Sequence, residues 1–191
     1  MKLNKTIVAV INQKGGVGKT TTVINLAAAL SILGQKNLII DLDPQGNATT
    51  GVGKSNNGEN KNIYNFLIKK NNISDVIQKT EIKGLDIIGS NVDLSGLEVE
   101  TANDNRRAFL LQSLLKENKS TIDQYDNVFI DCPPSLSLLT IMALVASNSL
   151  IVPLQAEFFA LEGLTQLIKT IERIKVSLNP DLKIRGILLT M

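Results

Sequence analysis

The 191-residue sequence predicts a doubly wound α/β domain, in which a mostly parallel sheet is flanked by helices. Three observations indicate this class. Short β-branched runs that are apolar on both faces are typical of strands in a covered parallel sheet. Segments with helical spacing separate these runs, and such strand–helix alternation favours parallel pairing. A glycine-rich loop also joins the first strand pattern to the first helix pattern.

Each strand is predicted from a short apolar run, and each helix from apolar side chains at helical spacing. The runs TIVAVI, NLIIDL and NVFID are apolar through their centres, so both faces of these strands can be buried. The predicted strands are, in order, Thr6–Ile11, Asn37–Leu42, Leu85–Ile88, Asn127–Asp131, Ser149–Val152 and Ile184–Thr190. The predicted helices are Lys19–Leu33, Asn105–Lys116, Ser135–Ala146 and Leu161–Leu178.

The connections between these elements contain residues that favour turns. Gly34 follows the first predicted helix, where a glycine commonly adopts the left-handed conformation that closes a helix. The polar stretch Gly53–Asn62 is predicted to be a surface loop. Residues 1–191 are expected to form a single domain. Because the chain stops at Met191 directly after a strand pattern, we expect this domain to be truncated at its C-terminus.

Composition excludes several kinds of site. Cys132 is the single cysteine and there is no histidine, which excludes intrachain disulfides, zinc sites with Cys or His ligands and His-dependent triads. Met1–Lys5 is short and polar, unlike a signal peptide, and no apolar run approaches the roughly 20 residues of a membrane span. The net charge of +2 does not identify a nucleic-acid partner. We therefore expect a cytoplasmic protein.

The most specific motif is the loop Gln13–Thr20, QKGGVGKT, between the first predicted strand and helix. Its glycines allow several backbone N–H groups to point at one anion, and the helix N-terminus adds the positive end of its dipole. In this P-loop pattern Lys19 reaches the β- and γ-phosphates of ATP, Thr20 ligates Mg²⁺, and Thr21 is placed to reach the α-phosphate. The complete strand–loop–helix context disfavours the alternative of a plain glycine-rich turn. The predicted ATP-binding residues are Lys14, Gly15, Gly16, Val17, Gly18, Lys19, Thr20 and Thr21.

Two aspartates follow predicted strands at the sheet edge where ligands bind in open α/β folds. Asp131 closes an apolar run, which is the Walker B pattern, and we expect it to hold Mg²⁺ directly or through water. Its alternative role is a cap for the following helix. Asp43 is predicted to orient the attacking water, although it could instead form a turn before Pro44. Asp41 lies within a strand and is interpreted as a supporting or structural group.

The string KGGVGKTT, residues 14–21, resembles the deviant Walker A motif of the superfamily that includes ParA, MinD and the nitrogenase iron protein. Gln13 stands where the usual P-loop pattern begins with glycine. The resemblance implies that Lys14 crosses a nucleotide-sandwich dimer to touch the phosphates of the partner. A second cation there would stabilise charge on the transferring phosphoryl group. The predicted catalytic residues are therefore Lys14, Lys19 and Asp43, and the predicted metal ligands are Thr20 and Asp131.

Three longer segments resemble ParA/Soj proteins in particular: Asp41–Gly51, Asp126–Leu144 and Val152–Leu167. The resemblance implies a slow, Mg²⁺-dependent ATPase that forms an ATP-dependent homodimer and coats nonspecific DNA, so that it is cytoplasmic and nucleoid-associated. It further implies a role in chromosome or plasmid segregation with a ParB-type partner that stimulates hydrolysis. Hydrolysis would release the dimer, because the γ-phosphate and Mg²⁺ hold it together. The DNA contacts would be electrostatic and therefore salt-dependent.

A MinD-like membrane-associated positioning ATPase is the main alternative. That class anchors through a C-terminal amphipathic helix, which this sequence does not show, and the segment DPQGNATTG differs from the MinD continuation. No membrane partner is therefore predicted. A nitrogenase-type iron protein needs two cysteines per subunit, and this chain has one. Family members continue past the position of Met191, which leaves open whether this chain binds DNA, or whether it binds nucleotide without catalysis.

Overall fold

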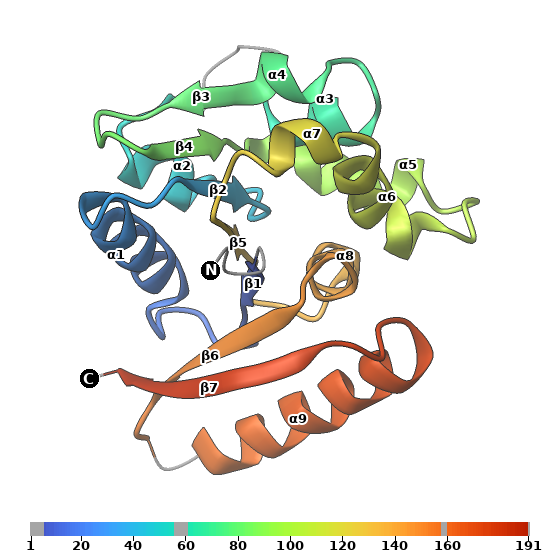
Figure 1. Cartoon of the computed structure of the whole chain (residues 1–191). Coiled ribbons are helices and arrows are strands. Elements are labelled where there is room, and N and C mark those ends of the chain that lie inside the picture. Colours follow the sequence, from blue (N-terminus) through green and yellow to red (C-terminus); the bar gives the residue numbers. More distant parts are fainter. Residues whose placement is uncertain (1–5, 56–60, 158–159, 191) are drawn as a thin grey trace.

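A seven-stranded sheet forms the centre of the computed structural model, which describes residues 6–55, 61–157 and 160–190 (Figure 1). The strand order is β3-β4-β2-β5-β1-β6-β7. All neighbouring strands are parallel except β3, which is antiparallel to β4. The strands are β1 (Thr6–Val10), β2 (Asn37–Asp41), β3 (Ile77–Lys79), β4 (Leu85–Ile88), β5 (Asn127–Asp131), β6 (Ser149–Gln155) and β7 (Lys183–Thr190). The sheet confirms the predicted doubly wound α/β class.

Helices lie on both sides of this sheet (Figure 1). They are α1 (Lys19–Ile32), α2 (Asn47–Gly51), α3 (Ile63–Leu67), α4 (Ile73–Val76), α5 (Leu97–Glu100), α6 (Leu110–Glu117), α7 (Lys119–Ile122), α8 (Leu138–Ala146) and α9 (Ala160–Ser177). Two 3₁₀ turns, Val92–Gly96 and Arg107–Phe109, precede α5 and α6. The side chains of α1 and α2 share one apolar core with the sheet, whereas those of α3, α6, α8 and α9 share the other.

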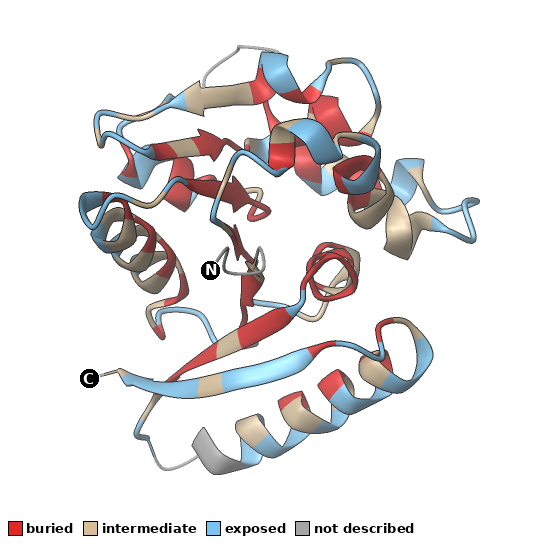
Figure 2. Ribbon diagram, viewed as in Figure 1, coloured by how far each residue is buried: buried red, intermediate tan, exposed pale blue. Residues whose placement is uncertain are grey.

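Strand β1 shows how the sequence builds these two cores. Its alternate side chains point to opposite faces, so Val8 and Val10 pack in the core with α1, while Ala9 packs in the core with α8. All three are completely buried. Figure 2 shows the same burial along the central strands, whereas the edge strand β7 is mostly exposed. A run that is apolar on both faces therefore corresponds here to a strand covered on both sides.

The predicted elements are present, with shifts in three of them; the strand predicted to end at Val152 continues to Gln155 as β6. Two predicted helices begin later than expected. Ser137 is extended, so α8 starts at Leu138, and a local turn in which Arg106 N–H donates to Asp104 delays α6 until after a 3₁₀ turn. The edge strand β3 and the helices of four or five residues were not predicted. Gly34 adopts a φ of 88° directly after the first helix, as expected.

The predicted loop Gly53–Asn62 is described only at its two ends, because residues 56–60 lie outside the described residues. Gly53 has a left-handed φ of 78°. Asn62 is buried rather than on the surface, because its side chain accepts a 3.0 Å hydrogen bond from Asn65 N–H and caps α3. Over the described segments, none of the helices has both the length and the apolar character needed to cross a bilayer.

Candidate nucleotide-binding site

The predicted site residues meet at the carboxyl ends of three adjacent strands, β2, β5 and β1. The loop from Gln13 follows β1 and opens α1, Asp41 ends β2, and Asp131 ends β5. The strand register pairs Asp131 with Val10 on one side and with Asp41 on the other, so these strand ends lie at the same level. Residues more than one hundred positions apart in the sequence are thereby brought to one edge of the sheet, where open α/β folds bind ligands.

A cavity of 730 Å³ opens at this edge. Most of the predicted phosphate-binding residues line it, together with the predicted water-orienting Asp43. Three predicted residues lie elsewhere: Asp131 is buried, and Lys14 and Val17 line a neighbouring cavity of 240 Å³. The lining of the larger cavity consists of Gly15, Gly16, Gly18, Lys19, Thr20, Thr21 and Asp43, and of four residues that were not predicted, Thr22, Asn47, Pro134 and Thr190.

The loop conformation suits the binding of an anion by backbone N–H groups. Gly16 and Gly18 adopt left-handed φ values of 76° and 86°, which glycine tolerates without strain. Two loop carbonyls accept hydrogen bonds from the ends of β6 and β7: Gln155 Nε2 donates to Gly16 O at 3.3 Å, and Thr190 Oγ1 donates to Val17 O at 3.0 Å. Within residues 6–55, 61–157 and 160–190, the amides of residues 15–19 have no recorded acceptor, so they can donate to phosphate.

Lys19 is the buried cation of the site, with 7% of its surface exposed. Its Nζ donates a 2.9 Å hydrogen bond to the carbonyl oxygen of Lys14, which folds the side chain back over the loop. Burial lowers the pKa of Lys19, and the nearby carboxylates of Asp131 and Asp43 oppose this change. An anionic ligand in the cavity would favour the charged ammonium further, because opposite charges at short range stabilise each other.

The pair Thr20–Asp131 has the chemistry of a magnesium site. Thr20 Oγ1 donates a 2.7 Å hydrogen bond to Asp131 Oδ2, whereas Asp131 Oδ1 is buried and has no hydrogen-bond partner in the described part of the chain. Burial, together with the neighbouring Asp41 carboxylate, raises the pKa of Asp131 to about 7. A buried carboxylate with an unpartnered oxygen fits a hard cation that prefers oxygen ligands. Within the described ranges, no cluster of three acidic, Cys or His side chains could hold a metal alone, so phosphates and water would complete the ligands.

Asp41 and Asp43 are placed differently after β2. Asp41 is fully buried; its Oδ2 accepts hydrogen bonds from Thr49 N–H at 2.9 Å and from Thr49 Oγ1 at 2.7 Å. Its Oδ1 accepts from Asp43 N–H at 3.1 Å, so Asp41 supports the segment that carries Asp43. The turn considered for Asp43 is present, because Asp43 Oδ1 accepts from Gln45 N–H at 3.0 Å. Asp43 nevertheless lines the cavity, so the turn also orients it there. Asp131 does not cap the next helix, whose N-cap is Ser137.

Glu157 was not among the predicted site residues, although it lies in the segment Val152–Leu167 that resembles ParA/Soj proteins. Its carboxylate forms an ion pair with Lys14 Nζ, and the two side chains are 55% and 52% exposed. The two residues are 143 positions apart, so no local spacing connects them. The pair places the Lys14 side chain beside the β6–α9 connection, outside the lining of the larger cavity.

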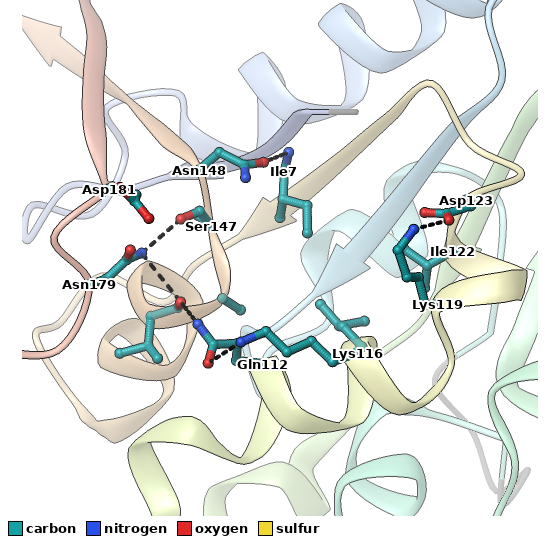
Figure 3. A pocket seen from close by; sticks show the side chains of 13 residues that line it. Ile7, Gln112, Lys116, Lys119, Ile122, Asp123, Ser147, Asn148, Asn179 and Asp181 are labelled. Atoms are coloured by element: carbon teal, nitrogen blue, oxygen red, sulfur yellow. Dashed lines mark hydrogen bonds and ion pairs between the residues drawn. The ribbon is translucent and has the colours of Figure 1, made fainter. Parts of the chain in front are cut away.

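Figure 3 shows a further cavity, of 390 Å³. Its lining includes Ile7, near the start of β1, and Asn148, just before β6, so it lies at the other end of these strands from the phosphate loop. It contains none of the predicted site residues. Its polar side chains satisfy the carbonyl groups at the end of α8: Asn179 Nδ2 donates to Leu144 O and Ser147 O at 2.8 Å, and Gln112 Nε2 donates to Val145 O at 2.8 Å. These bonds give the polar lining a structural explanation, because the last carbonyls of a helix have no partner within it.

Comparison with known proteins identifies the family. A family model described as an AAA domain matches residues 5–184. The chromosome partitioning protein ParA of Caulobacter vibrioides is 49% identical over 185 residues, covering 97% of this chain and 69% of the relative. The chain belongs to the ParA/Soj family. The sporulation initiation inhibitor protein Soj of Bacillus subtilis is 45% identical, over 97% of this chain and 72% of its own length.

Solved structures of ParA/Soj-like proteins have the same fold. A plasmid partition protein from Borrelia burgdorferi is 30% identical, with a TM-score of 0.82 over 97% of this chain and 79% of its own. A cobyrinic acid a,c-diamide synthase from Mycobacterium smegmatis, with bound ADP and magnesium, is 37% identical, with a TM-score of 0.90 over 97% of this chain and 74% of its own. The fold of this ParA/Soj chain is thus that of P-loop nucleotide-binding proteins.

Proposed function

We propose that this chain is a partitioning ATPase that binds ATP with Mg²⁺, hydrolyses it slowly and forms an ATP-dependent homodimer in the segregation of a chromosome or plasmid. The observation that supports this most strongly is the composition of the 730 Å³ cavity. Loop amides without acceptors among the described residues lie beside it, and the Thr20–Asp131 pair offers an unpartnered carboxylate oxygen below it. Amide donors suit phosphates, and the oxygen ligands suit the cation that accompanies them.

The loop residues hold the triphosphate in this proposal. The amides from Gly15 to Lys19 donate to phosphate oxygens, and the Lys19 ammonium neutralises the β- and γ-phosphates. Thr21 adds a hydroxyl on the α-phosphate side, at a position that lines the cavity. Thr20 and Asp131 hold Mg²⁺. When bound, this ion stabilises the charge that develops on the transferring phosphoryl group.

Asp43 orients the attacking water in this proposal, because among the residues that the structure describes it is the one carboxylate in the cavity lining. Its backbone is fixed by the hydrogen bond to Asp41 and its side chain by the bond from Gln45. Such fixation suits a positioning role, since phosphoryl transfer depends mainly on geometry and electrostatics. Lys14 would add a second cation at the phosphates of a partner subunit.

In this proposal, ATP binding and hydrolysis control contacts with DNA and with a second protein. ATP-bound dimers would bind nonspecific DNA on the nucleoid, and a ParB-type partner would stimulate hydrolysis and release them. The names of the relatives support this assignment, since they include chromosome partitioning and plasmid partition proteins. We also propose that the protein is cytoplasmic and does not bind a membrane. This chain spans 64% to 72% of the length of these relatives.

Sedimentation velocity with ATP and Mg²⁺, with and without nonspecific duplex DNA at low and high salt, tests this proposal. The wild-type chain should dimerise only with ATP, and the dimer should bind DNA at low salt, because neutralised phosphates release counterions. The Lys19→Ala variant is the control and should remain monomeric. A chain that binds ATP but stays monomeric, or a dimer that ignores DNA and pellets with anionic vesicles, would contradict the proposal; the second result would favour a membrane-associated ATPase.

A further inference from the structure

The ion pair between Lys14 and Glu157 connects the phosphate loop, which follows β1, to the segment that follows β6. We propose that Glu157 holds Lys14 away from the nucleotide cavity of its own subunit and releases it only when a second subunit presents its phosphates. The inference rests on the proposed function, in which Lys14 acts across a dimer. In this inference Glu157 is a positioning residue outside the P-loop motif. Its ion pair with Lys14 opposes dimerisation, because the pair must break before Lys14 can reach the partner subunit.

The backbone of Lys14 is fixed on both sides, which leaves its side chain as the mobile part. Its N–H donates a 3.0 Å hydrogen bond to Asn12 Oδ1, and its carbonyl accepts from Lys19 Nζ at 2.9 Å. With the peptide groups held, only the four-carbon side chain can change direction. It lines the 240 Å³ cavity, as Glu157 does, and is absent from the lining of the 730 Å³ cavity, which Lys19 lines.

Glu157 is held close to the loop by the end of β6. Asn12 Nδ2 donates to Pro153 O at 2.6 Å, and Gln155 Nε2 donates to Gly16 O at 3.3 Å. Glu157 N–H in turn donates to Gln155 O at 2.9 Å, which fixes the backbone next to this contact. The carboxylate therefore meets Lys14 because two hydrogen bonds join the segments on which the two residues lie.

The Lys14–Glu157 ion pair is weak enough for a phosphate group to displace the carboxylate. More than half of each side chain is exposed, at 52% and 55%, and ion pairs with this exposure are weak and screened by salt. Such a pair changes an equilibrium by up to about fivefold. A triphosphate carries several negative charges, so it competes effectively with one carboxylate for the ammonium. A symmetric dimer breaks two pairs, so removing them should lower its dissociation constant by up to roughly 25-fold.

The test compares Glu157→Gln with wild type in sedimentation velocity with Mg²⁺ and a nonhydrolysable ATP analogue. The variant should dimerise at a severalfold lower protein concentration, and its advantage should shrink at high salt. Glu117→Gln is the matched control, because it removes the carboxylate of another exposed pair, Lys69–Glu117, whose glutamate is 56% exposed. Unchanged or weaker dimerisation of Glu157→Gln would overturn the proposal.

A second measurement separates this inference from the proposed function. A carbodiimide joins an amine and a carboxylate that are in contact, so mass spectrometry should detect a Lys14–Glu157 cross-link in the nucleotide-free chain. The yield should fall when the analogue and Mg²⁺ are added at concentrations that support dimers. A cross-link that is absent without nucleotide, or that persists unchanged in dimers, overturns the inference. If Lys14→Ala dimerises as wild type does, the role of Lys14 across the dimer is wrong, whatever the cross-link shows.

Discussion

Replacing Asp131 by asparagine should stabilise the nucleotide-free chain at neutral to alkaline pH. The carboxylate is fully buried, and one of its oxygens has no hydrogen-bond partner among the residues that the structure describes. Burial and the adjacent Asp41 raise its pKa from 3.8 to about 7. Between these two values the folded carboxyl binds more protons than the unfolded one. The free energy of unfolding therefore falls as pH rises through this window, and the destabilisation is complete above it.

The size of the effect follows from the same values. Each pKa unit corresponds to about 1.4 kcal/mol, so raising the pKa of Asp131 from 3.8 to about 7 costs the fold ~4 kcal/mol once both states are ionised. The asparagine removes this cost but buries an amide N–H₂ without an acceptor, at a penalty of about 1–3 kcal/mol. The net expectation is a variant more stable than wild type by about 1–3 kcal/mol near pH 8, and no more stable near pH 5.

Urea unfolding followed by circular dichroism, without nucleotide or Mg²⁺, measures this difference across the pH range. Wild type should lose stability between about pH 4 and pH 7, and the variant should lose less, with the remaining slope due to Asp41, whose burial raises its pKa to about 6. Adding ATP and Mg²⁺ should reverse the order, because Asp131 then gains a cation. A variant that is less stable than wild type at pH 8, or that follows the wild-type pH dependence, would show that the buried carboxylate is not an energetic cost.

Three further substitutions test individual residues. Lys19→Ala should weaken ATP binding at least 100-fold in fluorescence titration, because the phosphates lose a buried cation worth about 3 kcal/mol, and retained affinity would contradict the P-loop assignment. Asp43→Ala should leave ATP affinity within a few-fold of wild type but slow hydrolysis by about 10²-fold in a phosphate-release assay, and an unchanged rate would exclude the water-orienting role. Gly89→Ala should lower the free energy of unfolding by about 1–3 kcal/mol, because the new Cβ would lie 2.8 Å from Thr49 Cγ2. Thr49 is the residue that donates two hydrogen bonds to Asp41. Gly51→Ala is its control, since there the nearest atom is the end of a flexible side chain and a loss below about 1 kcal/mol is expected.

The strands β1, β2, β4, β5 and β6 could be predicted from the sequence because they are mostly buried on both faces, whereas β7 was predicted from its apolar run although it is mostly exposed. Each of the six predicted strands is present within a few residues. The edge strand β3 has only three residues, IQK, which are intermediate or exposed, so it leaves no apolar run. The short helices α2 to α5 span four or five residues, which is too few for a helical period to show. Packing against the sheet, rather than local preference, stabilises such segments.

The residues of the candidate site could be predicted where they form a continuous motif in the sequence. The phosphate loop is one string, and Asp131 ends an apolar run, so both are visible in the sequence. Glu157 and Thr190 contact the loop from 143 and 173 positions away, and only the sheet order brings them there. Asp41 was interpreted as a supporting group, but its bonds to Thr49 and Asp43 depend on how the chain turns after β2. Such contacts are properties of the tertiary structure and have no local signature.

The strand order also bears on how the chain is made. Strand β1 pairs only with β5 and β6, and Asn127, the partner of Thr6, follows it by 121 positions. At a synthesis rate of about 5–20 residues per second, the ribosome adds this partner roughly 6 to 24 seconds later. The strand that leads into the phosphate loop is therefore translated well before either of its neighbours in the sheet. We expect nascent chains that end before β5 to expose β1 and to depend on chaperones until its partners follow.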